Sequence, residues 1–293
     1  MRSSVDTLRP GQEVSGVFAV TRKDRLTART GTPYLAVELR DATGRVAARA
    51  FRDADVLAGR FERGDLVRVR GRVERFRDEL QVELSEISRT APGEADPAAF
   101  LPRAYRDLEE LDGFLEHLAR EVHDAGYRAL LERLLADDEL RAAWRRAPCT
   151  RAGHHAYLGG LLEHTVAVGT LAFETRALHP RLNSDLLMSA ALLHDVGKTL
   201  EFDLAAEIAL SEAGALVGHL TLGQQLVSER ARRLEDFPEA KLNALSHCIL
   251  AHHGADALPG RRFRSAEALA LYRLNALDAG VKGALEHGIG LDE

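Results

Sequence analysis

The chain has 293 residues, a length that allows one large domain or two of ordinary size. Apolar residues make up 45% and charged residues 29%, a balance typical of globular proteins. The most apolar stretch covers residues 186–193, far short of the roughly 20 residues that span a bilayer. The opening residues lack the apolar region of a secretory signal, and two cysteines are too few for a disulfide scaffold. These features argue against a membrane protein and predict a cytoplasmic one.

Charge is distributed unevenly along the chain. The net charge is −6 overall, yet residues 1–90 carry a net charge of +4 and the remainder a net charge of −10. All twelve histidines follow residue 110. A basic front without histidine, joined to an acidic back rich in histidine, predicts two domains with different tasks. A mildly basic domain is suited to following a phosphate backbone.

The first 90 residues have the pattern of a small β-barrel. Apolar and polar residues alternate, or β-branched residues are enriched, in five short segments: 11–20, 33–40, 45–51, 65–73 and 79–87. Five short strands in about 80 residues predict an OB-like barrel over residues 1–90. Another small Greek-key barrel that serves only for packing has the same strand count, so this alternative stays open.

Helices are expected after the barrel. Residues 91–103 are rich in proline, alanine and glycine and predict a linker. Apolar residues at three- and four-residue spacing then predict bracing helices over residues 104–147, followed by the core of an all-α domain over residues 150–280. The predicted fold class is therefore a multi-domain α+β protein, with an OB-like barrel before an all-α domain at 104–293.

Residues with chemical potential are concentrated in the second domain. The string LLHDVGK places His194 and Asp195 in the last turn of a predicted helix, with Gly197 as the residue that ends it. Neighbouring helical residues diverge by about 100°, so this pair can offer two ligands around one point. Helical spacing also turns His164 toward the core, although a single histidine so placed is more often a core residue. Asp278 shares a face with Leu271 and Leu274, and a buried carboxylate is costly unless it is paired or binds a metal.

Lys198 directly follows the His-Asp-Val-Gly string. Only four of the 39 basic residues are lysine, so a lysine here suggests a need for a compact ammonium, as for a phosphate oxygen. Chance placement is the alternative.

The order of these motifs, GGLLEHT, LLHDVGK, GHL, AHHG and ALDAG, resembles the HD-domain metal-dependent phosphohydrolases. Together with the OB-like front, the chain from about Gly11 to Asp278 is similar to the YhaM-type 3′→5′ exoribonucleases. The resemblance implies catalytic roles for Asp195 and Lys198. It also implies seven metal ligands: His164, His194, Asp195, His219, His252, His253 and Asp278.

The resemblance also implies cofactors and a substrate. Two metal ions about 3.5–4 Å apart can hydrolyse a phosphodiester, and mixed imidazole and carboxylate ligands suit Mn²⁺, Fe²⁺, Co²⁺ or Ni²⁺. We expect two ions, with Mn²⁺ the favoured metal and Asp195 bridging them. The expected reaction releases nucleoside 5′-monophosphates from the 3′ end of single-stranded RNA, with single-stranded DNA and a homo-oligomer as open alternatives.

Four residues are candidates for binding the substrate: His155, Glu163, Tyr34 and Phe51. For His155 and Glu163 the alternative is a non-functional position, since residues so placed more often face the solvent or cap a helix. Phe51 stands where the resemblance leads us to expect tryptophan. Phe18 and Phe76 are further possible stacking platforms, although small barrels commonly use aromatic residues as core.

Two other functions stay open. One is an HD hydrolase of cyclic dinucleotides or nucleotides with a regulatory barrel. However, the residues after AHHG lack the Gly-Tyr-Pro string of cyclic-di-GMP enzymes. The other is a non-catalytic protein that binds single strands and carries a decayed HD domain. The intact set of seven candidate ligands argues against such decay.

Overall fold

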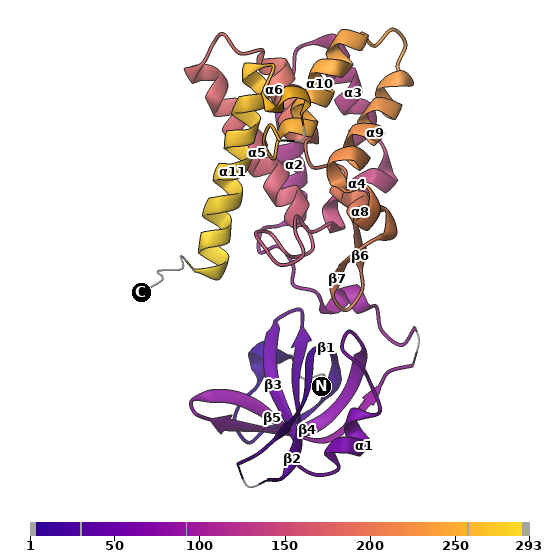
Figure 1. Ribbon diagram of the computed structural model, residues 1–293, viewed down its shortest axis with the longest axis vertical. Helices are drawn as coiled ribbons and strands as arrows, with labels where there is room; N and C mark the ends of the chain where they lie inside the picture. The colour runs from indigo at the N-terminus through magenta and orange to yellow at the C-terminus, as the bar shows by residue number, and fades with distance from the viewer. Residues whose placement is uncertain (1–3, 30, 92, 257, 289–293) are drawn as a thin grey trace. The chain divides into compact units, whose positions relative to one another are not determined.

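A computed structural model describes residues 4–29, 31–91, 93–256 and 258–288. The chain divides into two compact units (Figure 1). The first contains Met1–Pro102 together with Leu204–Ala209, and the second contains Arg103–Asp203 and Leu210–Glu293. Among the described residues, no helix has both the length and the apolar character that crossing a membrane requires.

The first unit is a closed five-stranded barrel. Its strands are β1 (Glu13–Thr27), β2 (Pro33–Asp41), β3 (Gly44–Ala50), β4 (Leu66–Phe76) and β5 (Glu79–Arg89), joined in the order β1-β2-β3-β5-β4. The β3–β5 pair is parallel and the other pairs are antiparallel. A short helix, α1 (Ala54–Ala58), lies between β3 and β4 in the chain. The predicted OB-like barrel is confirmed, and its interior is filled by alternating side chains such as Phe18, Leu35, Val67 and Ile87.

The second unit is helical. Its helices are α2 (Leu108–Arg120), α3 (Ala125–Leu135), α4 (Asp138–Arg146), α5 (Gly160–Leu178), α6 (Ser184–Leu193), α7 (Lys198–Glu201), α8 (Glu212–Leu216), α9 (His219–Arg232), α10 (Glu239–Ala251) and α11 (Ala266–His287). Several begin at an aspartate or asparagine whose side chain accepts backbone N–H groups of the first turn, as Asp107, Asp124 and Asn183 do. Leu161, Val168, Leu187 and Leu192 of α5 and α6 are fully buried in its core.

One element was not expected from the sequence. Residues 202–210 form a small hairpin of β6 (Phe202–Leu204) and β7 (Ile208–Leu210) inside the otherwise helical part of the chain. Its turn, Leu204–Ala209, belongs to the first compact unit, where the Arg40 guanidinium donates to the carbonyl of Ala206. Strands of three residues are too short to show a recognisable alternation, which explains why the all-α prediction missed them.

The β4–β5 pair gives a prediction about barrel stability. The register shifts next to Gly71, and a Cβ atom there would lie 2.3 Å from the carbonyl oxygen of Glu83. We expect Gly71→Ala to destabilise the barrel by about 1–3 kcal/mol, because the partner backbone must move. Hydrogen exchange of the barrel amides would measure the effect. Gly59→Ala is the matched control, since its Cβ would meet heavy atoms only at 3.7 Å; equal protection in the two variants would contradict the prediction.

Candidate metal centre

Asp195 lies in the turn between α6 and α7, directly after His194. The sequence interpretation of Gly197 as a helix-ending residue was wrong, because Gly197 has helical angles (φ −63°) and precedes α7. Its role is close packing: a Cβ there would lie 2.1 Å from the carbonyl oxygen of His219 and 2.4 Å from the amide nitrogen of Gly223. Glycine therefore lets the first turn of α9 approach the turn that carries Asp195.

One oxygen of Asp195 faces two buried histidines. The Nε2 atoms of His164 and His194 are 3.2 Å apart, and they lie 3.6 Å and 3.4 Å from Asp195 Oδ2. The Nδ1 atom of His194 donates to the carbonyl of Ala191 at 2.8 Å. A neutral His194 therefore has its lone pair on Nε2, directed toward the other two side chains.

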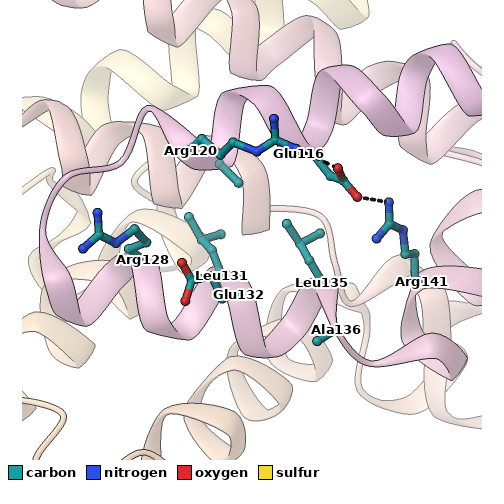
Figure 2. A pocket seen from close by; sticks show the side chains of 9 residues that line it. Glu116, Arg120, Arg128, Leu131, Glu132, Leu135, Ala136 and Arg141 are labelled. Carbon is teal, nitrogen blue, oxygen red and sulfur yellow. Dashed lines mark hydrogen bonds and ion pairs between the residues drawn. The ribbon is translucent and has the colours of Figure 1, made fainter.

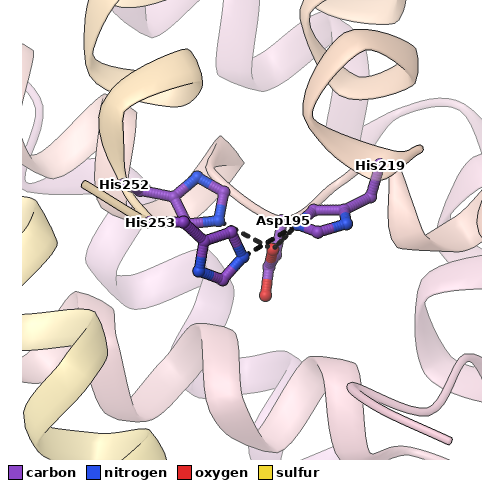
Figure 3. A group of neighbouring side chains, drawn as sticks. All are labelled: Asp195, His219, His252 and His253. Atoms are coloured by element: carbon purple, nitrogen blue, oxygen red, sulfur yellow. Dashed lines mark hydrogen bonds and ion pairs between the residues drawn. The ribbon is translucent and has the colours of Figure 1, made fainter. Parts of the chain in front are cut away.

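The other oxygen of Asp195 faces a second set of histidines, drawn in Figure 3. Asp195 Oδ1 lies 3.2 Å from His252 Nε2 and 3.6 Å from His219 Nε2. His219 Nε2 is in turn 3.0 Å from His253 Nε2. The Nδ1 atom of His252 donates to the carbonyl of Ile249, and that of His219 lies 2.9 Å from a Glu201 oxygen. Such contacts fix which ring nitrogen is free to bind a metal.

These residues fit divalent cations. Asp195 Oδ1 and His252 Nε2 are buried and have no hydrogen-bond partner among the described residues. Ligand atoms about 2.1 Å from an ion at right angles to each other lie about 3.0 Å apart. The distances around both oxygens of Asp195 are near that value. Two of the four groups of possible ligands among the described residues contain Asp195, and these two are the candidate sets: His164, His194 and Asp195 form one, and Asp195, His219, His252 and His253 form the other.

Burial keeps the histidines in the form that binds metals. Loss of hydration lowers the pKa of His252 to about 3 and that of His253 to about 4. For Asp195, burial alone raises the pKa, but the nearby Lys198 charge and His194 outweigh it and hold that pKa well below its usual range. At neutral pH the imidazoles of His252 and His253 are therefore neutral while the Asp195 carboxylate is ionised.

Lys198 contacts Asp195 in this structure. Its buried ammonium donates to Asp195 Oδ2 at 2.6 Å and to the sulfur of Cys149 at 3.4 Å. The cysteine sulfur is also 3.6 Å from Asp195 Oδ2. Sequence analysis gave Cys149 no role, because the two cysteines lack the spacing of a zinc-binding motif. Lys198 thus neutralises the carboxylate shared by the two candidate sets.

Asp278 lies apart from His194 and Asp195. Its Oδ2 atom is 2.6 Å from Nδ1 of His164, whereas the candidate set lies at Nε2 of that ring. An oxygen at Nδ1 is too distant to bind an ion held at Nε2. Asn275, which sequence analysis did not consider, is buried with its Oδ1 atom 2.9 Å from His164 Nε2. The signal that could have found it is its position one turn before Asp278 on the same face of α11.

The predicted substrate-binding residues of this domain have mixed outcomes. His155 is 1% exposed, so a solvent-facing position is wrong for it. Its Nε2 atom lies 3.5 Å from Asp278 Oδ2. Glu163 accepts from the hydroxyl of Tyr157 at 2.8 Å and from Lys282 at 3.2 Å. Glu163 is therefore held by its neighbours outside both candidate sets. His247 accepts the backbone N–H of Arg264.

Aromatic residues gather on the barrel surface. Tyr34 and Phe51 stack with ring centroids 5.4 Å apart, and the Arg49 guanidinium lies 5.7 Å from the Tyr34 ring and 5.1 Å from the Phe76 ring. Phe51 and Phe76 are 43% and 45% exposed, so a core role is wrong for them. Phe18 is fully buried and belongs to the core. We call Tyr34, Arg49, Phe51 and Phe76 the aromatic surface.

A separate hollow of about 680 Å³ is lined by residues of α2, α3 and α4 (Figure 2). Within it, Glu116 pairs with both Arg120 and Arg141. Arg141 also binds the buried carboxylate of Asp112, which joins α2 to α4. The polar lining of this hollow therefore consists in part of ion pairs that hold the helices together.

The lowered histidine pKa values predict how stability depends on pH. Burial lowers the pKa of His154 to about 4 and that of His155 to about 2, below the value of about 6.5 for an unfolded chain. The unfolded state therefore binds protons first, so stability is full above about pH 6.5 and falls toward pH 4. We expect the urea midpoint of metal-free protein to drop steeply between pH 7 and pH 5, and less steeply in His154→Gln. A midpoint that does not change over this range would contradict the prediction.

Comparison with known proteins agrees with this architecture. The family model described as HD domain matches residues 161–280, and the model described as OB-fold nucleic acid binding domain matches residues 17–89. The 3′-5′ exoribonuclease YhaM of Shouchella clausii is 27% identical over 251 residues, covering 84% of this chain and 76% of that relative. The protein of the same name from Oceanobacillus iheyensis is 26% identical over 247 residues, covering 83% and 76%. The chain is therefore an HD-domain protein with an N-terminal OB-fold, homologous to the proteins named 3′-5′ exoribonuclease YhaM.

Proposed function

We propose that this protein is a metal-dependent 3′→5′ exoribonuclease that releases nucleoside 5′-monophosphates from single-stranded RNA. The observation that carries the proposal is the position of Asp195, whose two oxygens face two different sets of buried histidines. A carboxylate so placed is suited to bridging two ions. The proposed substrate and the 3′→5′ direction of cleavage are taken from the relatives named 3′-5′ exoribonuclease. These relatives match 83–84% of the chain.

The residues around Asp195 would each have a distinct task. Divalent ions, with Mn²⁺ favoured by the mixed imidazole and carboxylate donors, would supply activation of water and neutralisation of phosphate charge. Backbone carbonyls hold the rings of His194 and His252 with Nε2 directed inward, and Glu201 does the same for His219. Lys198 holds the Asp195 carboxylate in place. The protein thus presents a preformed set of ligands.

The aromatic surface of the barrel supports a single-stranded substrate. Exposed rings beside a guanidinium can stack on unpaired bases of any identity, because every base has a π-face. The Arg49 guanidinium lies within 5.7 Å of both the Tyr34 and the Phe76 ring centroids, so it can meet a backbone phosphate beside stacked bases. Such binding discriminates poorly between sequences, as an enzyme that shortens a strand stepwise requires.

The reaction can be tested with RNA labelled at its 5′ end. With Mn²⁺ we expect a ladder of products that shorten from the 3′ end, with nucleoside 5′-monophosphate as the released species. Asp195→Ala should lower the rate at least about a thousandfold and lose bound metal, because the shared carboxylate has no substitute. Cyclic dinucleotides and dNTPs are assayed in parallel. Hydrolysis of these with intact RNA would instead favour an HD hydrolase of another class, and binding of RNA without metal or hydrolysis would favour a binding protein.

The aromatic surface gives a separate prediction. Phe51→Ala and Phe76→Ala should each raise KM for a long single strand by about tenfold to a hundredfold, since one base stack contributes about 1–3 kcal/mol. Turnover of a dinucleotide should stay near the wild-type value, because the candidate ligands lie in the other unit. Val56→Ala on α1, an exposed apolar residue of the same barrel, is the matched control. If all three variants keep the wild-type KM for long RNA, the aromatic surface does not bind the substrate.

A further inference from the structure

We propose that the amide oxygen of Asn275, rather than the carboxylate of Asp278, completes the metal-binding set formed by His164, His194 and Asp195. Asp278 is then a positioning residue that acts through His164. This inference rests on the metal dependence in the proposed function, but it concerns which atom binds the ion and can be tested by binding alone.

The first argument is distance. Asn275 Oδ1 lies 2.9 Å from His164 Nε2, comparable with the 3.2 Å that separates the His164 and His194 Nε2 atoms. Asp195 Oδ2 lies 3.4 Å and 3.6 Å from those two nitrogens. Ligand atoms of one ion are expected about 3.0–3.4 Å apart when each is about 2.1 Å from it. Asn275 Oδ1 therefore has the spacing of a member of this set.

The second argument is the orientation of the amide. Asn275 Nδ2 donates to the carbonyl of His252 at 3.2 Å, and a carbonyl can only accept. Turning the amide over would place its oxygen against that carbonyl oxygen. The hydrogen bond therefore fixes Oδ1 toward His164. The side chain is also buried, so water does not offer an alternative arrangement.

The third argument is the location of protons. Asp278 Oδ2 accepts from Nδ1 of His164 at 2.6 Å, which leaves the lone pair of a neutral His164 on Nε2. A neutral His194 likewise has its lone pair on Nε2, because its Nδ1–H donates to the carbonyl of Ala191. Asn275 Oδ1 and Asp195 Oδ2 are acceptors as well. The other three acceptor atoms all lie within 3.6 Å of His164 Nε2, and a cation among them would satisfy the four together.

The role of Asp278 follows from the same contact. A carboxylate that accepts the Nδ1–H of a metal-binding histidine fixes the tautomer and the ring orientation, and increases the basicity of Nε2. His155 Nε2 lies 3.5 Å from the same oxygen. Asp278 therefore acts on the ion only through His164.

The charge of the set differs from that of a set with two carboxylates. Asp195 is its single anionic ligand, and that charge is already paired with Lys198. The neutral amide of Asn275 adds no negative charge. The ion at this position should consequently bind more weakly than it would with a carboxylate at residue 275, and this difference can be measured.

The experiment compares Mn²⁺ binding to full-length wild type, Asn275→Asp, Asn275→Leu and Asp278→Asn, by bound metal under chelator competition and by melting temperature with and without Mn²⁺. Asn275→Asp should lower the Kd at least tenfold. It should also lower the metal-free melting temperature, because a carboxylate cannot donate to the His252 carbonyl. Asn275→Leu should raise the Kd at least tenfold. Asp278→Asn keeps an acceptor for His164 Nδ1 but loses the carboxylate charge that increases the basicity of Nε2, so it should raise the Kd about tenfold.

Unchanged Mn²⁺ affinity in both Asn275 variants would overturn the inference. Should a variant fail to fold, anomalous diffraction of wild-type crystals with Mn²⁺ decides the question, by a peak in contact with Asn275 Oδ1 or its absence there. Mn²⁺ binding that responds as expected without RNA hydrolysis would leave this inference standing and remove the proposed function. RNA hydrolysis with unchanged Mn²⁺ affinity in the Asn275 variants would support the proposed function and overturn this inference.

Discussion

The arrangement of the helical unit depends on one buried carboxylate. Asp195 is almost completely removed from water, and an isolated ionised carboxylate in such a place is strongly unfavourable. The Lys198 ammonium at 2.6 Å compensates one of its oxygens, while the other has no hydrogen-bond donor among the described residues. Maintaining an unsatisfied acceptor beside several histidine lone pairs reduces the stability of the metal-free fold. A bound cation would compensate the unsatisfied oxygen of Asp195 and the lone pairs of the histidines together.

This requirement explains local features of the sequence. Gly197 permits α9 to approach the turn that carries Asp195, so His219 reaches the carboxylate from a separate helix. The carbonyls of Ala191 and Ile249 accept from His194 and His252, each three residues later in the chain. Both rings lie at the C-terminal end of a helix, where carbonyls lack helical partners. The helix ends thus orient the ligands and have their own carbonyls satisfied in return.

The sequence predicted the barrel, the helical domain and the grouping of His194 with Asp195, because these follow from alternation and helical spacing. Spacing identifies a face of a helix and does not identify an atom. Asn275 and Asp278 share a face of α11, so periodicity could not decide which of them meets His164 Nε2 and which meets Nδ1. The same limit applies to Phe51 and Phe76, since a strand pattern does not reveal that a ring at the end of a barrel strand is exposed. Cys149 and the 202–210 hairpin left no signal of their own.

Within the proposed function, the charges of the centre bear on the substrate as well as on the ions. Near the histidines lie the carboxylates of Asp195, Glu201 and Asp278, opposed by the Lys198 ammonium. Two divalent ions would bring more positive charge than these groups offset, and such a centre in a poorly hydrated site attracts an anionic ligand strongly. A carboxylate in place of Asn275 would reduce that excess. A neutral amide at residue 275 therefore exchanges some affinity for metal against affinity for phosphate, and the anionic phosphodiester would further reduce the positive charge of the centre.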